Sequence, residues 1–215
     1  MKEKKDYIPA LKYGFLTPFF DLFLGLLTPE RKFKGALISE AEIKPGQKIL
    51  DFGCGTATLT IMAKTSCSEA DVAGIDIDEK IIEIAEKKVE KSGLSIEIVH
   101  YQGGKLPFED GTFDKVISSL VFHHLTTIQK NTVLNELYRI LKAEGSLLIG
   151  DFGKPKNFLM AFLSNLLRLL EPIDDNIRGK LPKMIRQAGF QEAVETRYFN
   201  TVFGTISIYK AIKQL

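Results

Sequence analysis

The chain has 215 residues, with 29 Lys and Arg, 27 Asp and Glu and a formal net charge of +2. This length allows one domain with a sizeable core, and the nearly balanced charge gives no reason to expect a nucleic-acid partner. The only cysteines are Cys54 and Cys67, and the charged N-terminus shows no secretory leader, so we expect a reducing, cytoplasmic compartment. The most apolar runs, 15–27 and 158–170, have about 13 residues. This is below the ~20 of a membrane-spanning helix, but contact with a membrane surface stays open.

Residues 1–44 are expected to form helices without a chemical motif. Lys44-Pro45-Gly46-Gln47 then predicts a turn that leads into an apolar strand at 48–52. Strand and helix patterns alternate from there to Gly150. The expected strands are 48–52, 71–76, 95–100, 113–119 and 146–150, and the expected helices begin at Thr58, Asp78 and Thr127, the last ending at Lys142 before Gly145.

This alternation predicts a parallel sheet with right-handed crossovers and helices on both faces. Ligands bind such sheets outside the carboxyl ends of the strands. The tail differs, because residues 155–188 are largely helical in pattern. The runs 191–199 and 201–212 then predict a closing antiparallel hairpin that turns around Asn200.

The stretch Asp51-Phe52-Gly53-Cys54-Gly55 places an acid and two glycines between the first strand and the next helix. Glycine has no Cβ and tolerates positive φ, so a ligand can approach the backbone there. The helix behind the turn offers unpaired N–H groups. Thr58 stands where a dinucleotide fingerprint needs its third small residue, and no P-loop pattern is present. An acid before the first glycine suits a cationic ligand, which points to S-adenosylmethionine.

Together with Thr56 and Ala57, this stretch resembles the first motif of class I S-adenosylmethionine-dependent methyltransferases, with Ala57 at the family's third glycine. Three further stretches are similar to later motifs of the family. They are Gly74-Ile75-Asp76-Ile77-Asp78, the "LPF…FD" stretch at 106–114 and the "RvLkpGG" stretch at 138–146. Asp151-Phe152-Gly153-Lys154-Pro155 and residues 204–209 resemble, more loosely, the menaquinone/ubiquinone C-methyltransferase subgroup of the type 11-like methyltransferases. Its members methylate small, often lipophilic acceptors.

The resemblance implies an α/β fold with a Rossmann-like, seven-stranded, mostly parallel sheet and an antiparallel C-terminal strand. We expect one methyltransferase domain over 1–215. Its parts would be an N-terminal helical cap (1–44), a cofactor-binding core (45–151), a helical lid (152–188) and a C-terminal β-hairpin (189–215).

The resemblance also implies how S-adenosylmethionine is held. Asp76 would accept both ribose hydroxyls, and Ile77 would lie against the adenine. Gln102-Gly103 stand where the family often has Asp-Ala, and the glutamine carbonyl can still accept from the adenine amino group. Ser119 would hold the methionine part. The expected cofactor residues are Asp51, Gly53, Gly55, Thr56, Asp76, Ile77, Gln102, Gly103 and Ser119.

Other roles remain open for several of these polar residues. Asp51 and Asp76 can be helix caps, and Gln102 can be a plain loop residue. His123 and His124 are candidates for a base or a substrate contact, with a structural role at a helix start as the alternative. We expect no metal, because adjacent histidines rarely chelate one ion together. Tyr13, Phe20 and Arg178 are the candidates for substrate contact.

The sequence therefore predicts methyl transfer to a small, apolar, quinone- or lipid-like acceptor by direct displacement. The alternatives are a non-catalytic module that binds S-adenosylmethionine and a nicotinamide-dependent oxidoreductase. The acceptor atom and the oligomeric state are not readable from the sequence.

Overall fold

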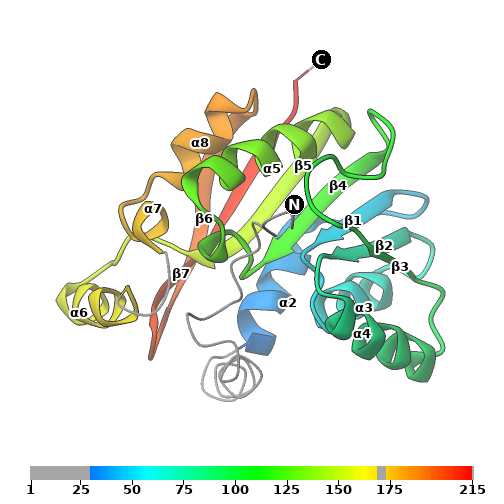
Figure 1. Cartoon of the computed structure of the whole chain (residues 1–215), viewed down its shortest axis with the longest axis horizontal. Coiled ribbons are helices and arrows are strands. Elements are labelled where there is room, and N and C mark those ends of the chain that lie inside the picture. Colours follow the sequence, from blue (N-terminus) through cyan, green and yellow to red (C-terminus); the bar gives the residue numbers. More distant parts are fainter. Residues whose placement is uncertain (1–29, 169–172, 215) are drawn as a thin grey trace, which may run out of the picture.

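Residues 30–168 and 173–214 are described in the computed structural model drawn in Figure 1. The predicted substrate residues Tyr13 and Phe20, and most of the predicted cap over 1–44, lie outside these ranges. Among the described residues, no helix combines the length and the apolar character that a membrane crossing requires.

Seven strands form one sheet in the order β3-β2-β1-β4-β5-β7-β6. The strands from β1 to β5 pair in parallel, whereas β7 runs antiparallel to β5 and β6 antiparallel to β7. This confirms the predicted Rossmann-like sheet with its antiparallel C-terminal strands. The strands are β1 (Lys48–Phe52), β2 (Asp71–Asp76), β3 (Glu97–His100), β4 (Phe113–Ser119), β5 (Leu141–Phe152), β6 (Gln191–Thr201) and β7 (Gly204–Ile212).

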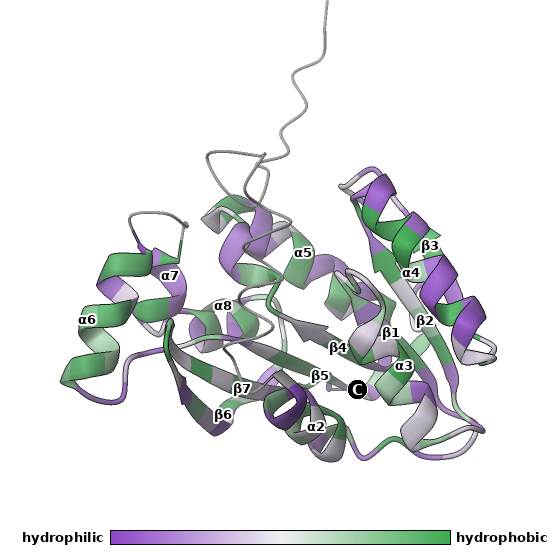
Figure 2. Cartoon of the chain, turned by 90° about the horizontal axis from the view of Figure 1, so that it is seen from below, coloured by the Kyte–Doolittle hydropathy of each residue, from purple (hydrophilic) through white to green (hydrophobic). Residues whose placement is uncertain are grey.

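Helices cover both faces of the sheet (Figures 1 and 2). Helices α2 and α3 pack on one face with α4 beside α3, and α5 and α8 pack on the other. The remaining helices, η1, α6 and α7, follow the carboxyl ends of β4 and β5. The helices are α2 (Glu30–Ala41), α3 (Thr58–Ser66), α4 (Glu79–Ser92), η1 (Phe122–His124), α5 (Thr127–Ile140), α6 (Phe158–Leu167), α7 (Asp174–Ile177) and α8 (Leu181–Gln187).

The central strand β1 shows why the sheet strands read as apolar runs. Ile49 packs in the cluster that contains α2 and α3, while Leu50 and Phe52 pack in the cluster that contains α5 and α8. All three side chains are buried, since a parallel strand with helices on both faces has no solvent side. The end of β1, and the turn that follows it, are therefore fixed by two separate cores.

The predicted boundary between the last crossover helix and β5 is wrong. The helix ends at Ile140 and β5 begins at Leu141, so Gly145 lies inside the strand and does not end the helix. The pairing with β4 shifts register there. A Cβ on Gly145 would lie 2.8 Å from the Lys142 carbonyl oxygen, so glycine accommodates an irregularity in the strand.

The closing hairpin exists, but the predicted turn is displaced. Asn200 lies within β6, and the chain reverses at Val202 and Phe203. The Thr201 hydroxyl donates to the Gly204 carbonyl (2.8 Å) and accepts from the Phe203 N–H (3.2 Å). This local capping by a threonine hydroxyl fixes the turn there.

Candidate functional site

The glycine turn after β1 is bound to the end of β2. The N–H groups of Gly53 and Cys54 both donate to the Ile75 carbonyl, at 2.8 and 3.0 Å. Gly53 has φ +69°, and a Cβ there would lie 2.3 Å from a methyl carbon of Val121. The turn therefore requires glycine at this position for its backbone conformation and for its packing.

Asp76, at the end of β2, holds the same turn in place. Its Oδ2 accepts from the Gly55 N–H (2.9 Å), and its Oδ1 accepts from the N–H groups of Ile77 (2.7 Å) and Asp78 (3.1 Å). Asp78, not Asp76, is the N-cap of α4. Asp76 is half-buried, so its carboxylate is both fixed and accessible at the sheet edge.

Asp51, the next-to-last residue of β1, is 1% exposed. Its Oδ2 accepts from the Thr60 hydroxyl (2.7 Å), and its buried Oδ1 has no hydrogen-bond partner among the residues described. Burial raises the pKa of Asp51 to about 6. The N-cap of α3 is Ala57, so Asp51 is not a helix cap. A buried carboxylate oxygen without a partner is costly unless a donor or a cation reaches it.

Of the residues predicted to hold the adenine, Ile77 and Gly103 lie next to each other. Ile77 is half-buried, and its Cδ1 lies 3.4 Å from the position of a Cβ on Gly103, which has φ +86°. A side chain at 103 would therefore fill the space beside Ile77. Gln102, the residue before Gly103, is exposed, and its role in binding the adenine stays a prediction.

Ser119, at the end of β4, has a buried hydroxyl without a hydrogen-bond partner in the described part of the chain. Its neighbour Ser118 donates to the Phe52 carbonyl (2.8 Å) and so ties β4 to the end of β1. Thr56 is exposed in the glycine turn. The carboxyl ends of β1, β2 and β4 thus bring together two acids, a glycine turn and an unpaired hydroxyl.

The two predicted histidines have different surroundings. His123 is 4% exposed, and its Nδ1 lies 3.0 Å from Oδ1 of Asp151 at the carboxyl end of β5. His124 is half-buried, and the two rings lie 3.8 Å apart between centroids. The sequence reasoning missed Asp151 as the partner of His123, although β4 and β5 are adjacent parallel strands that end at one edge.

Asp151 is fully buried and accepts hydrogen bonds at both oxygens. Besides His123 Nδ1, its donors are the N–H groups of Phe122 (2.7 Å), His123 (3.3 Å) and Phe152 (2.7 Å), and Nδ2 of Asn176 (3.2 Å). Burial alone raises the pKa of Asp151, but the His123 ring and these donors hold it below its ordinary value. The carboxylate therefore stays ionised and fixes the ring of His123.

A second group of ion pairs involves Asp175, whose neighbour Asn176 contacts Asp151. The ammonium of Lys130, on α5, is buried with Nζ 3.7 Å from Oδ2 of Asp175, whose Oδ1 pairs with Lys180 at 2.9 Å. Burial lowers the pKa of Lys130. Arg178, a predicted substrate residue, is exposed beside them in a hollow of about 460 Å³ that Thr127 and Asp174 also line. No residue of the glycine turn lines this hollow.

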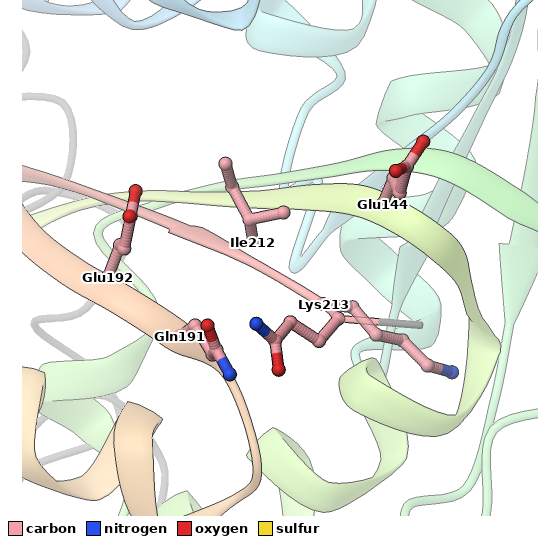
Figure 3. A pocket seen from close by; sticks show the side chains of 6 residues that line it. Glu144, Gln191, Glu192, Ile212 and Lys213 are labelled. Carbon is pink, nitrogen blue, oxygen red and sulfur yellow. The ribbon is translucent and has the colours of Figure 1, made fainter.

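Another hollow, of about 480 Å³, lies away from this edge (Figure 3). Glu144 lines it near the start of β5, whereas Asp151 lies near the end of that strand. The other lining residues are Gln191, Glu192, Ile212, Lys213 and Gln214. Neither hollow includes a predicted cofactor residue. Within the ranges described, no group of three or more His, Cys, Asp or Glu could hold a metal ion.

Comparison with known proteins gives matches that agree with this geometry. Residues 49–145 match the family model of the methyltransferase domain. Demethylmenaquinone methyltransferases of Thermus thermophilus and Bacillus subtilis are each 32% identical, over 142 and 130 residues. These alignments cover 65% and 60% of this chain. The chain spans 64% and 55% of the relatives' own lengths, which is less than two thirds of each.

The fold has close counterparts among solved structures. A SAM-dependent methyltransferase from Aquifex aeolicus superposes with a TM-score of 0.67 at 21% identity, over 89% of this chain and 97% of that chain. The family match begins in β1 and ends within β5, so it contains the glycine turn, Asp76 and Ser119. By this match, residues 49–145 form a methyltransferase domain, and the motifs and fold of the chain are similar to those of S-adenosylmethionine-dependent methyltransferases.

Proposed function

We propose that this chain transfers the methyl group of S-adenosylmethionine to a small, apolar acceptor of the quinone type. The observation that carries the proposal is the pair of buried, unpartnered oxygens, Asp51 Oδ1 and Ser119 Oγ, beside a glycine turn. The printed names of the relatives support the quinone class, since both act on demethylmenaquinone.

The residues present fit the cofactor. The unpartnered oxygen of Asp51 suits its ammonium group, and the Ser119 hydroxyl suits the polar end of its methionine part. Asp76 would accept the ribose hydroxyls, and Ile77 and Gly103, which lie next to each other, would flank the adenine. When bound, S-adenosylmethionine supplies a methyl group that its sulfonium already activates. The protein then has mainly to align the acceptor and exclude water.

The His123–Asp151 pair supplies the proton acceptor in this proposal. A hydroquinone carbon becomes more nucleophilic when its hydroxyl loses a proton, so a base speeds the transfer. In a neutral His123 ring that donates from Nδ1 to Asp151, Nε2 carries no proton and can accept one. His124, stacked on His123 and closer to solvent, is the other candidate.

Titration calorimetry of Asp76→Ala with S-adenosylmethionine tests the cofactor site. We expect at least about a tenfold loss of affinity, because the charge-assisted bonds to the ribose disappear. Circular dichroism should show a retained fold. Wild-type affinity in a folded variant would contradict the ribose assignment.

Methyl transfer itself is tested with a labelled cofactor and a short-chain reduced naphthoquinone. We expect one labelled methyl group on a ring carbon, identified by mass spectrometry. Cofactor binding without transfer to this quinol or to a lipid extract would favour a non-catalytic module. Binding of NADH in place of S-adenosylmethionine would favour an oxidoreductase.

A further inference from the structure

Helix α6 presents an apolar face that nothing in the described structure covers. Phe158 is 89% exposed and Phe162 61%, with Leu159 and Leu166 also more than half exposed. On the opposite face Met160, Ser164 and Leu167 are buried, and Ser164 and Leu167 pack on the β6–β7 hairpin. Figure 2 shows α6 as a mostly apolar helix at the margin of the molecule. An exposed apolar surface of this kind marks an interaction site.

The neighbouring hairpin carries another exposed apolar side chain. A Cβ on Gly204 would lie 2.5 Å from the Ser164 hydroxyl, so the hairpin turn and α6 are in direct contact. Val202, in the turn, is 52% exposed. The α6 face is defined by Phe158, Leu159, Phe162 and Leu166, and Val202 is a further exposed apolar side chain, on the hairpin that packs against the opposite side of α6.

Positive charge flanks α6 along the chain, although the whole chain has a net charge of only +2. Lys154 and Lys156 are exposed immediately before α6, and Arg168 is exposed immediately after it. Lys156 also pairs with Glu195, and Arg168 with Asp174. Residues 154–168 contain no acid.

We propose that the α6 face docks on the surface of an anionic lipid bilayer. Phe and Leu side chains on one face of a helix, with Lys and Arg at its ends, are typical of helices that lie in the interface plane. Positive charge at the helix ends matches anionic headgroups. Since α6 follows β5 directly, docking would place the Asp151 edge near the membrane. The purpose of this docking rests on the proposed function. An apolar quinone acceptor is held in the bilayer, and docking would bring the site close to it.

Vesicle flotation of the full chain tests the docking. We expect binding to vesicles of phosphatidylcholine with phosphatidylglycerol, weaker binding to phosphatidylcholine alone, and weakening by added salt. Phe158→Ser combined with Phe162→Ser should lower the partition coefficient by about tenfold or more. Ile128→Ser is the matched control, because Ile128 is 78% exposed on α5, away from the α6 face, and it should bind like the wild type.

Two charge-reversal variants and a measurement of the assembly state complete the test. Lys154→Glu should weaken binding to the anionic vesicles, whereas Lys87→Glu, at an exposed position of α4, should not. A wild type that binds no vesicles would overturn the proposal, and so would equal binding by the double variant and Ile128→Ser. A dimer in light scattering that the double variant dissociates would assign the face to a second copy and also overturn it. Vesicle binding without methyl transfer to the soluble quinol would contradict the proposed function alone.

Discussion

Asp51 and Asp76 lie near the carboxyl ends of neighbouring strands, but their surroundings give them different chemistry. Asp76 accepts three backbone N–H groups at a half-buried position. Asp51 is buried with one oxygen unpartnered, and burial raises its pKa to about 6. Asp76 is therefore suited to neutral hydroxyl donors, whereas Asp51 needs a cationic ligand to stabilise its ionised form.

The raised pKa of Asp51 predicts a pH dependence of cofactor affinity. Below about pH 6 the carboxyl of the unbound protein takes up a proton and can no longer pair with an ammonium group. We expect the Kd for S-adenosylmethionine to rise with falling pH, by up to about tenfold per pH unit. Calorimetry from pH 8 to pH 5 measures it.

Asp51→Asn is the control for this dependence, because it keeps the shape and removes the titrating group. It should bind weakly at every pH in that range. A wild-type Kd that stays constant from pH 8 to pH 5 would contradict the assignment of Asp51 to the ammonium group. The same raised pKa has the opposite effect on the folding stability of the unbound protein. The stability that Asp51 contributes is present at low pH and is lost as pH rises through about 6.

Gly53→Ala tests the packing of the glycine turn. A Cβ would lie 2.3 Å from Val121 at a backbone φ of +69°, so we expect a loss of about 2–4 kcal/mol of unfolding free energy, measured in urea. Gly46→Ala is the matched control, because Gly46 has φ +76° and no atom within 4 Å, and it should lose only about 1 kcal/mol. Equal losses would show that the contact with Val121 does not matter, whereas Val121→Ala should restore part of the stability of Gly53→Ala.

The histidines predict a pH-dependent rate. His123→Gln should lower kcat by about a hundredfold and remove the rise of kcat with pH that a histidine base gives. The Kd for S-adenosylmethionine should change little. His124→Gln, measured in parallel, distinguishes the two candidates. A kcat that neither substitution changes would exclude a histidine base.

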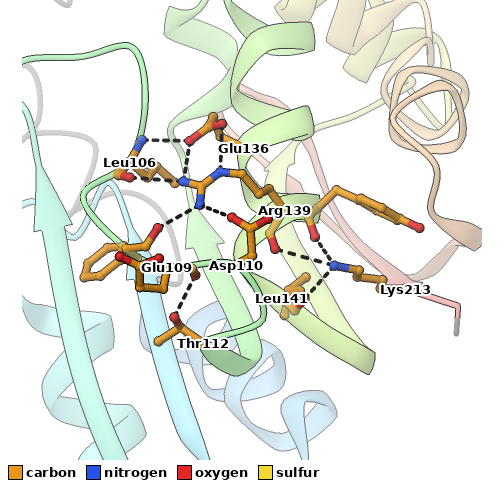
Figure 4. A network of polar contacts seen from close by, with 10 residues as sticks. Leu106, Glu109, Asp110, Thr112, Glu136, Arg139, Leu141 and Lys213 are labelled. Atoms are coloured by element: carbon orange, nitrogen blue, oxygen red, sulfur yellow. Dashed lines mark hydrogen bonds and ion pairs between the residues drawn. The ribbon is translucent and has the colours of Figure 1, made fainter.

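At the scale of elements, α5 holds the loop that precedes β4 (Figure 4). The Arg139 guanidinium donates to the carbonyls of Leu106 (3.1 Å) and Phe108 (2.7 Å) and pairs with Glu136 (2.7 Å). Glu136 in turn accepts from the Leu106 N–H at 2.8 Å. The "LPF" and "RvLkpGG" stretches, which resemble two separate family motifs, therefore contact each other as one unit.

Arg139→Ala should cost about 2–3 kcal/mol of unfolding free energy, because it leaves two loop carbonyls without their charged donor. Hydrogen exchange at residues 103–111 should accelerate, and cofactor affinity should fall, since Gly103 lies in this loop. Lys142→Ala is the control. The Lys142 side chain is 42% exposed in its pair with Asp114, and such pairs contribute less than about 1 kcal/mol. A loss no larger than that of Lys142→Ala would contradict this role of Arg139.

The elements themselves were largely predictable, because strands buried on both faces form apolar runs and the amphipathic α4 shows helical spacing. The start of β5 was not, since Leu141 continues the helical spacing of α5 and only pairing with Phe113 makes it a strand residue. The His123–Asp151 contact was not predictable either. It joins residues 28 positions apart and depends on the adjacency of β4 and β5 in the sheet. Spacing along the chain does not show which strands are neighbours.

At the scale of the whole molecule, the polar residues of the candidate site and the exposed apolar face of α6 lie in different regions. The carboxyl ends of β1, β2 and β4 hold the residues predicted to bind the cofactor, whereas α6 lies toward the other margin of the molecule (Figures 1 and 2) and carries the exposed Phe and Leu side chains. An apolar acceptor that reaches the site from the α6 side would meet the methyl group at the His123–Asp151 pair. The two ligands would then approach from different sides, and neither would block the other.

Ligand binding should therefore stabilise the whole domain, because the cofactor would connect three strand ends that the unfolded chain cannot hold together. At about 100 times its Kd, S-adenosylmethionine should add roughly 2.7 kcal/mol to the unfolding free energy. For a chain of this length this corresponds to a rise in Tm of roughly 5–10 °C. Differential scanning fluorimetry measures the shift, and Asp76→Ala should lose most of it at the same cofactor concentration. No shift in the wild type, or an equal shift with NADH, would contradict the assignment of this sheet edge to S-adenosylmethionine.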